Sequence, residues 1–366
     1  MKKTLLFAAA ASVALAGCVK NDPANGGAVA SDAKISFDAP AVGAVTRAEL
    51  GEIVGIYPTE ESFKVWGWYH EGNYTTFNDA SNDWKNYMTD ASGNPIAVSH
   101  NGETPGSWVS ATDYYWPKNG GKLTFAAYSP ADAVGTYTHI AEGLQIAGFT
   151  VAAAGAQYDL MYSDRSYNRT ASDNLYAGTA SNTYTTGVDI VFHHALSSIV
   201  FKVGTTENYS TADLDFKIKK IEIKGANNTG SFTQGIVEGT SLTVSNPAWS
   251  GQTGTADYVA FTGSFNVPED GTTRTEPTDA EDLILLPQTF SDSHDVVVEI
   301  TYTMETAASG EIEHVKQFNL KDATNAATWE PNKRYTYQIL FGVEKILFAP
   351  VVEDWTDVTV TDDIKF

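Results

Sequence analysis

Cysteine and basic residues are scarce in this sequence, and each shortage excludes a class of function. The only cysteine of the 366 residues is Cys18, so the rest of the chain has no disulfide framework and no thiolate metal site. Lysine and arginine together number 23 against 45 aspartates and glutamates, which gives a formal charge of −22. A chain this acidic is not expected to bind nucleic acid or an anionic membrane surface.

Motifs that build active sites are missing as well. The sequence contains no G-x-S-x-G, H-E-x-x-H, P-loop or dinucleotide-binding pattern. His193 and His194 are the only adjacent histidines, and neighbours in a strand point to opposite faces, so the two do not readily ligate one metal ion. We interpret His194 as a packed core residue. We therefore expect no enzyme activity, no metal and no cofactor.

Strand-forming patterns dominate the rest of the chain. Apolar residues make up 42% of it and aromatic residues 12%, enough for a sizeable core, and the length favours two domains. No segment keeps a helical period for more than a few turns. Strand-forming residue patterns predict an all-β fold of antiparallel β-sandwiches, with strands at residues 63–69, 122–128, 158–162, 214–224, 283–286, 296–304, 312–320 and 335–341. Residues 63–69 carry aromatic or β-branched residues on both parities, which predicts a central strand covered on two sides. Within 214–224 the apolar parity changes between Ile218 and Ile221, which predicts a bulge.

The run VDIVFHHALSSIVFKV, residues 188–203, divides the chain. Its apolar residues change parity near residues 195–198, so we expect a bulge or a short turn there. The segment before it is rich in serine, threonine, asparagine and glycine and has no periodicity. We therefore predict that the run opens a second domain, with a first domain over residues 48–186 and a second over 187–366.

Residues 1–18 have the features of an export signal. Two lysines precede an apolar run that is too short to cross a bilayer. The tetrapeptide LAGC that ends at Cys18 resembles the lipobox of bacterial lipoproteins, whose cysteine sulfur carries a diacylglycerol. Several acyl chains, palmitate among them, would anchor the exported protein firmly to the outer membrane. A chance cysteine after an ordinary signal peptide is the alternative interpretation.

Residues 19–47 are expected to form a tether followed by a short strand. The tether is rich in alanine, glycine, asparagine and aspartate, and Ile35 and Phe37 then alternate with polar residues. A lone arginine in a small-residue loop, such as Arg47 before Ala48, is where an extracellular trypsin-like protease cuts. An uncut surface arginine is the alternative.

Three tryptophans of the first domain allow two interpretations. Trp84, Trp108 and Trp116 lie in long connections that are rich in polar residues. They suit a stacking platform for the sugar rings of a glycan, and they also suit the commoner role of aromatic side chains that pin loops onto a sandwich core.

The C-terminal residues predict a long strand. Val358, Val360, Ile364 and Phe366 share one parity, which only Asp362 interrupts. Nine residues at about 3.3 Å each span roughly 30 Å, the length of a sandwich. Such a strand either closes its own domain or adds to the open edge of a neighbour as a donor strand.

Six segments taken together resemble the fimbrillins, the type V pilins of Gram-negative anaerobes. They are FKVWGWY at residues 63–69, YWPKNGGKLTFAAYSP at 115–130, QYDLMY at 157–162, VFHHALSSIVFKV at 191–203, LILLPQTF at 283–290 and WEPNKRYTYQI at 329–339. The resemblance implies two tandem transthyretin-like β-sandwich domains, lipidation at Cys18 and assembly into surface fimbriae. It also implies that an Arg-specific protease cuts after an arginine placed like Arg47, which removes the first strand so that a strand from the next subunit fills the vacated site.

Two functional hypotheses follow. The first is a lipidated subunit of cell-surface fimbriae that polymerises with other fimbrial subunits by donor-strand exchange and supports adhesion. The second is a monomeric surface lipoprotein that binds a glycan or a host protein through the aromatic loops. In both cases the expected partners are the outer membrane, through the lipid, and a host or bacterial surface receptor.

Overall fold

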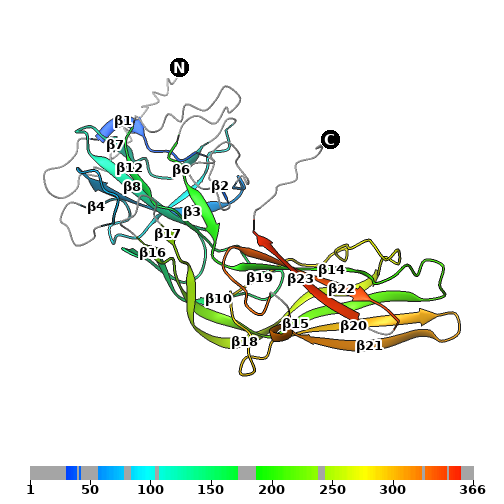
Figure 1. The fold of residues 1–366 in the computed structure, drawn as a ribbon. Helices are drawn as coiled ribbons and strands as arrows, with labels where there is room; N and C mark the ends of the chain where they lie inside the picture. Colours follow the sequence, from blue (N-terminus) through cyan, green and yellow to red (C-terminus); the bar gives the residue numbers. More distant parts are fainter. Residues whose placement is uncertain are drawn as a thin grey trace, which may run out of the picture.

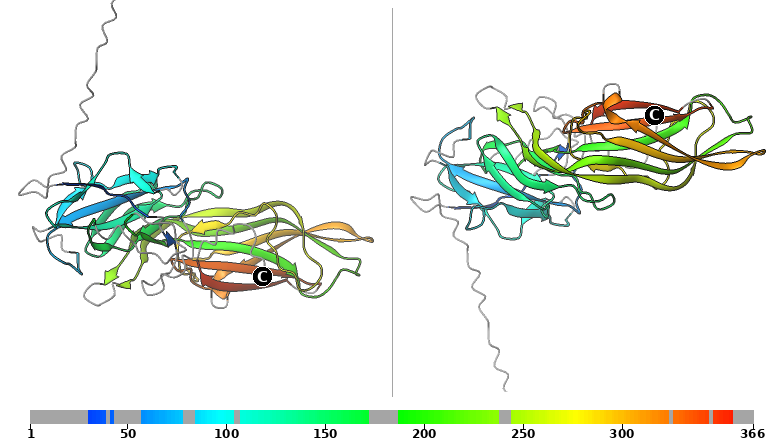
Figure 2. Two further views of the ribbon diagram at one scale, coloured as in Figure 1. Left: turned by 90° about the horizontal axis from the view of Figure 1, so that it is seen from above. Right: turned by 90° about the horizontal axis from the view of Figure 1, so that it is seen from below.

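A computed structural model describes residues 30–38, 41–42, 57–77, 84–103, 107–171, 187–237, 244–323, 326–343 and 346–355. Within these ranges the regular elements are strands, apart from the single 3₁₀ turn η1 (Leu320–Asp322). The strands form two lobes arranged end to end (Figures 1 and 2). The predicted all-β class is confirmed.

A broad sheet forms most of the first lobe. Its strands, in spatial order, are β2 (Ala41–Val42), β13 (Val191–His194), β11 (Met161–Ser163), β8 (Lys122–Ser129), β3 (Ser62–His70), β5 (Ile96–His100) and β6 (Trp108–Ser110), with β12 (Ser166–Arg169) on β8 and β4 (Lys85–Met88) on β3. Along β3, Phe63 and Val65 face one core while Trp66 and Trp68 face the other. The prediction that this strand is covered on both faces is therefore confirmed.

A second large sheet runs through both lobes. It contains β21 (Gly310–Asn319), β20 (Val297–Thr306), β15 (Asp215–Thr233), β10 (Gly143–Thr150), β9 (Thr136–Ile140) and β18 (Ala248–Asn266). The first half of β15 pairs with β20 and its second half with β10, while β18 pairs along nearly all of it. These two strands of 19 residues each therefore connect the lobes (Figure 1).

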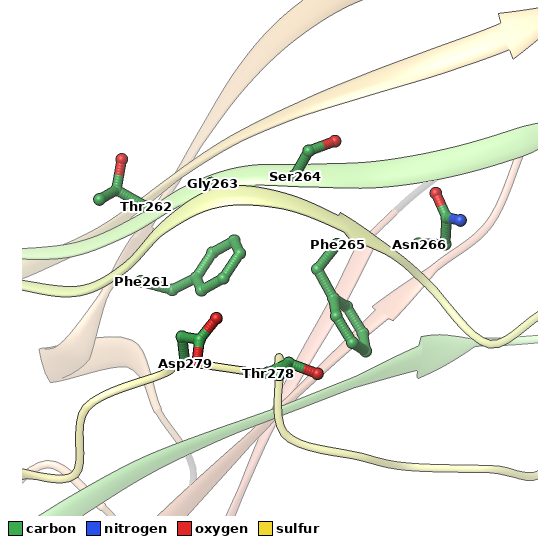
Figure 3. Close-up of a pocket in the computed structure, with 8 residues that line it drawn as sticks. All are labelled: Phe261, Thr262, Gly263, Ser264, Phe265, Asn266, Thr278 and Asp279. Carbon is green, nitrogen blue, oxygen red and sulfur yellow. The ribbon is translucent and has the colours of Figure 1, made fainter.

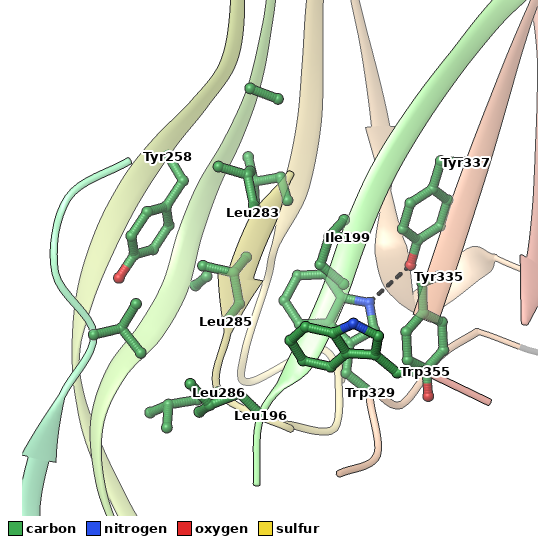
Figure 4. Packing of buried hydrophobic residues seen from close by; sticks show 14 of the residues in the cluster. Leu196, Ile199, Tyr258, Leu283, Leu285, Leu286, Trp329, Tyr335, Tyr337 and Trp355 are labelled. Carbon is green, nitrogen blue, oxygen red and sulfur yellow. Dashed lines mark hydrogen bonds between the residues drawn. The ribbon is translucent and has the colours of Figure 1, made fainter. Parts of the chain in front are cut away.

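The second lobe is closed by a smaller sheet. Its strands are β19 (Leu283–Leu285), β14 (Ser197–Thr205), β22 (Lys333–Phe341) and β23 (Ile346–Asp354), and the remaining short pairs are β1 (Ala30–Lys34) with β7 (Tyr115–Pro117) and β16 (Ile236–Val237) with β17 (Val244–Ser245). Ile199 and Tyr337 lie in its packed core (Figure 4), where the indole nitrogen of Trp329 donates to the Tyr337 hydroxyl at 2.9 Å. The pairs β14–β22 and β2–β13 are parallel, so the expectation of purely antiparallel sheets was incomplete.

The run of residues 188–203 passes from the first sheet to the smaller sheet within the run and not at its start. The predicted change of face is confirmed, because β13 and β14 are separated by Ala195 and Leu196. However, β13 pairs with β11 in the first sheet, where His194 lies opposite Met161. The expected boundary between residues 186 and 187 therefore does not separate the sheets, and the second half of β15 also packs with the first lobe.

Candidate functional site

The start of the described chain, residues 30–38 and 41–42, lies across both edges of the first sheet. We call it the leading segment. On one side, β1 pairs with β7, and the Ile35 amide donates to the Tyr114 carbonyl at 2.8 Å. Phe37 and Trp108 exchange two backbone hydrogen bonds, of 2.9 and 3.1 Å. This side of the segment therefore covers the β6 edge.

The other side of the leading segment covers the β13 edge. The Val188 amide donates to the Ser36 carbonyl at 2.8 Å, and the Asp38 amide donates to the Val188 carbonyl at 3.2 Å. Further on, β2 runs parallel to β13, with Val42 opposite Phe192. We call the two edges that the segment joins the seam. Without the segment, N–H and C=O groups on both edges of the seam would lose their partners, a cost that another strand can offset.

Side chains of the leading segment complete one of the two cores of the first lobe. We call this core, which contains Phe63 and Phe125, the inner core. Phe37 and Val42 are fully buried, and Ile35 is 3% exposed. The Phe37 ring makes edge-to-face contacts with Phe63 and Phe125 at centroid distances of 5.7 and 5.5 Å. Each such side chain contributes about 1.5–3 kcal/mol by its burial. The segment is therefore part of the core although it lies at one end of the described chain.

Gly187 lets the leading segment approach the seam. A Cβ atom at this position would lie 2.1 Å from the Asp38 nitrogen and 2.3 Å from the Phe37 carbonyl carbon, well inside any real contact. Both atoms belong to backbone, so no side-chain rotation relieves the overlap. Any residue other than glycine here would push the segment out of the seam.

Most processing and polymerisation residues predicted from sequence lie outside the described ranges. Lipidation at Cys18, cleavage between Arg47 and Ala48 and the donor strand with Val358, Val360, Ile364 and Phe366 therefore stay predictions. The described chain places two features next to them. The leading segment ends at Val42, and β23, which lies at an edge of the smaller sheet, precedes the C-terminal residues.

The tryptophans proposed as glycan contacts are mostly core residues. Trp108 is 2% exposed and Trp116 is fully buried, because both pack into the inner core with Phe37 and Phe125. Trp84 is half-buried and packs against Trp68 and Phe77 on the opposite face of the first sheet. The buried rings of Trp108 and Trp116 do not offer a face to a sugar, so the stacking platform is wrong for these two residues.

The histidine pair lies as expected from strand geometry. The ring of His193 contacts Asp164 at 3.1 Å, whereas Nδ1 of His194 donates to Asp159 at 2.6 Å. Across the described ranges, no group of three or more histidine, cysteine or acidic side chains could hold a metal ion. In the same residues, no helix has the length and apolar character needed to span a bilayer.

A hollow of about 370 Å³ lies at the end of β18 (Figure 3). Two phenylalanine side chains, Phe261 and Phe265, lie beside hydroxyl groups and the carboxylate of Asp279. No histidine, lysine or cysteine lines it. The lining therefore brings together no nucleophile with a base, and we assign it no chemistry.

Sequence reasoning found the strand of the leading segment but missed its two-sided pairing. The alternation of Ile35 and Phe37 predicts a short strand. Phe37 pairs with Trp108 on one edge, more than 70 positions away, and with Val188 on the other, more than 150 positions away. The one local signal was Gly187, because a glycine beside a strand marks a close backbone approach.

These features define a class of protein: two β-sandwich lobes that share long strands, with a first lobe completed by a segment from the start of the chain. The family model described as fimbrillin-like matches residues 46–355 of the chain. The chain therefore belongs to the fimbrillin-like family, as the resemblance predicted.

Solved structures share the fold. A fimbrial protein from Bacteroides vulgatus has a TM-score of 0.58 at 16% sequence identity, and the match covers 88% of this chain and 100% of that one. A candidate cell adhesion protein from Bacteroides ovatus has a TM-score of 0.50 at 17% identity, with 92% and 100% of the two chains covered. At such identities the likeness establishes the fold alone. No curated protein matches the sequence.

Proposed function

We propose that this protein is a structural subunit of cell-surface fimbriae, exported as an outer-membrane lipoprotein through Cys18. An Arg-specific protease cuts after Arg47, the leading segment leaves, and the terminal strand of another subunit takes its place in the seam. Membership of the fimbrillin-like family supports this function, and so do the solved structures of fimbrial and adhesion proteins that share the fold.

The pairing of the leading segment with both edges of the seam carries the proposal. Its removal would unpair backbone groups of Trp108, Tyr114 and Val188 and would uncover the sites filled by Ile35 and Phe37. The opened seam would be unfavourable in water, because backbone groups would lose their partners and apolar side chains would become exposed. An incoming β-strand restores both, because its main chain pairs on two sides while alternate side chains enter the core.

The predicted donor strand repeats the side-chain pattern of the leading segment. The buried residues Ile35 and Phe37 are separated by Ser36, and Ile364 and Phe366 are separated by Lys365. In an extended strand, each tripeptide would place its two apolar side chains on one face and its polar side chain on the other. We therefore place Ile364 and Phe366 of the donor in the sites that Ile35 and Phe37 vacate.

Cleavage of the purified protein tests the proposal. Trypsin or an Arg-specific protease should release the leading segment and produce ladders of polymers that resist SDS. Arg47→Ala should stay monomeric under the same treatment, whereas Arg274→Ala, a matched control in the second lobe, should polymerise like the unmodified chain. Monomers that persist after confirmed cleavage at Arg47 would overturn the proposal.

A reversible lock separates departure of the segment from cleavage itself. Phe37 and Trp108 exchange hydrogen bonds as an antiparallel pair. In regular antiparallel register, Ser36 and Val109 would form the adjacent, closer-spaced pair. In a Cys18→Ser background, the double variant Ser36→Cys/Val109→Cys should form a disulfide that retains the segment after cleavage. Oxidised protein should remain monomeric, and reduction should start polymerisation.

A further inference from the structure

Trp355, the last described residue, is held at the junction of the lobes. Its ring stacks on the imidazole of His194 with a centroid distance of 3.8 Å and an interplanar angle of 7°. His194 is fully buried, and its Nδ1 donates to the Asp159 carboxylate at 2.6 Å. Trp355 itself is 5% exposed and lies beside Trp329 at the end of the second core (Figure 4). The carboxylate fixes the imidazole, and the imidazole provides a flat surface for the indole.

The strand that carries His194 also carries the leading segment. In β13, Val191 and Phe192 lie opposite Ala41 and Val42, and His194 follows two positions later. The four residues of β13 therefore contact the leading segment at one end, through Val191 and Phe192, and Trp355 at the other end, through His194. Both contacts depend on the position of the same short strand.

Contacts with β22 and with the core hold the chain where β23 ends. The pairing of β22 with β23 finishes at Lys333 opposite Asp354, and the two side chains form an ion pair. The Trp355 amide then donates to the Asn332 carbonyl at 3.2 Å. The stack on His194 is thus the last contact described before residues 356–366, which contain the predicted donor strand.

We propose that Trp355, His194 and Asp159 form a latch that retains the root of the C-terminal tail while the leading segment occupies the seam. When the segment leaves, β13 loses its partner on one edge, His194 loses its fixed position, and Trp355 separates from it. The three are positioning residues, and the latch couples the two ends of one chain. Its role in timing donor-strand release rests on the function proposed above, whereas the coupling is a property of the monomer.

Hydrogen exchange on the uncut monomer tests the coupling. Gly187→Ala displaces the leading segment without a protease, and it should speed amide exchange in residues 351–355 about tenfold, the effect of losing one charge-assisted hydrogen bond. Trp355→Leu should speed exchange in residues 34–42 and 188–194 by a comparable factor, because coupling between two sites is reciprocal. Asp159→Asn keeps the shape of the carboxylate and should act in the same direction as Trp355→Leu.

A histidine stack elsewhere provides the control. His314 stacks on Tyr302 at 5.3 Å in the second lobe, away from β13. His314→Gln should leave exchange in both regions unchanged. Unchanged exchange at the far end of β13 in either Gly187→Ala or Trp355→Leu overturns the latch. Failure of the cleaved protein to polymerise overturns the fimbrial function instead, because the exchange measurement needs no polymer.

Discussion

The two lobes complete their cores in opposite ways. In the first lobe, the leading segment joins the β6 and β13 edges and fills the core with Ile35, Phe37 and Val42. In the second lobe, the core is filled from strands of its two sheets and is continuous with one core of the first lobe, and across the described ranges β21 and β23 each pair on one side only. Phe348 of β23 stacks on Phe318 and Tyr337 at 4.8 Å and covers the opening between the sheets. The first lobe therefore depends on a segment from the start of the described chain, whereas the described core of the second lobe is filled from strands within its sheets.

The solvent faces differ as well. In the second lobe, lysines of β15 pair with glutamates of β20 and β21, as in Lys217 with Glu305 at 2.6 Å and Lys219 with Glu311 at 2.8 Å. In the first lobe, both faces of the central strands are covered by apolar side chains. The first lobe thus has apolar side chains on both faces of its central sheet, whereas the second lobe has a charged outer face.

The largest expected difference between the lobes comes from one phenylalanine ring in each. Phe37→Ala should lower the free energy of unfolding by about 3–5 kcal/mol, because it leaves a cavity against Phe63 and Phe125. Phe348→Ala, at a half-buried position, should cost about 1 kcal/mol. Urea unfolding of both variants checks this, and equal losses would remove the distinction between the lobes.

Gly187→Ala should produce the next largest effect. The new methyl group overlaps the Asp38 backbone, so we expect a loss of about 1–3 kcal/mol in the first lobe, with the second lobe affected only around Trp355, which contacts β13. Gly230→Ala is the control, since its Cβ would lie 3.2 Å from the Trp249 ring. Thermal unfolding followed by exchange in each lobe measures both, and a Gly187→Ala protein as stable as the control would contradict the close approach.

Acid should weaken the first lobe through His139. Burial among Trp66, Trp68 and Phe77, followed by the charge of Arg165, holds the pKa of His139 well below its ordinary value of 6.5. The unfolded chain therefore binds a proton that the folded chain does not. This contribution to stability is complete above pH 6.5 and is lost as the pH falls below it, by at most about 1.4 kcal/mol per pH unit.

His139→Phe should remove that pH dependence while keeping the aromatic packing. Unfolding midpoints between pH 7 and 5 provide the measurement. A slope that persists in the variant would assign the effect to other groups.

The smallest effect should come from the charged face of the second lobe. Lys217→Met removes the half-exposed pair with Glu305 and should lower the free energy of unfolding far less than Phe37→Ala does, a loss that added salt reduces. Unfolding at low and high ionic strength tests this. A loss as large as that of Phe37→Ala would show that the second lobe depends on its surface charges.

The sequence predicted those parts of the fold that have a clear apolar pattern. Alternation found β20 and β22, whereas β3 was found because aromatic and β-branched residues occupy both of its parities. The parity change predicted within residues 214–224 coincides with a register shift in β15 between Ile218 and Lys220. β18 was missed because Thr and Gly residues, including Gly251 and Gly254 with positive φ, interrupt the alternation along an exposed edge. β9 and β10 were missed for a similar reason, since much of the hairpin is exposed.

The site was only partly predictable. Alternation around Phe37 indicated a strand, and Arg47 indicated processing, but neither says which edges the strand joins. That information lies in pairings with Trp108 and Val188, which only the folded chain brings together. The sheet change within residues 188–203 was likewise predicted as a bulge, because local parity records a change of face and not a change of partner.

A cross-link between two copies tests the central claim most directly. With Cys18 replaced by serine, one protein carries Val109→Cys in the seam and a second carries Lys365→Cys, the position that matches Ser36. After cleavage at Arg47 and mixing, the account predicts a disulfide that joins the two different chains, and none before cleavage. Cleaved chains that form no mixed disulfide, while each protein alone stays monomeric and folded, would contradict the account.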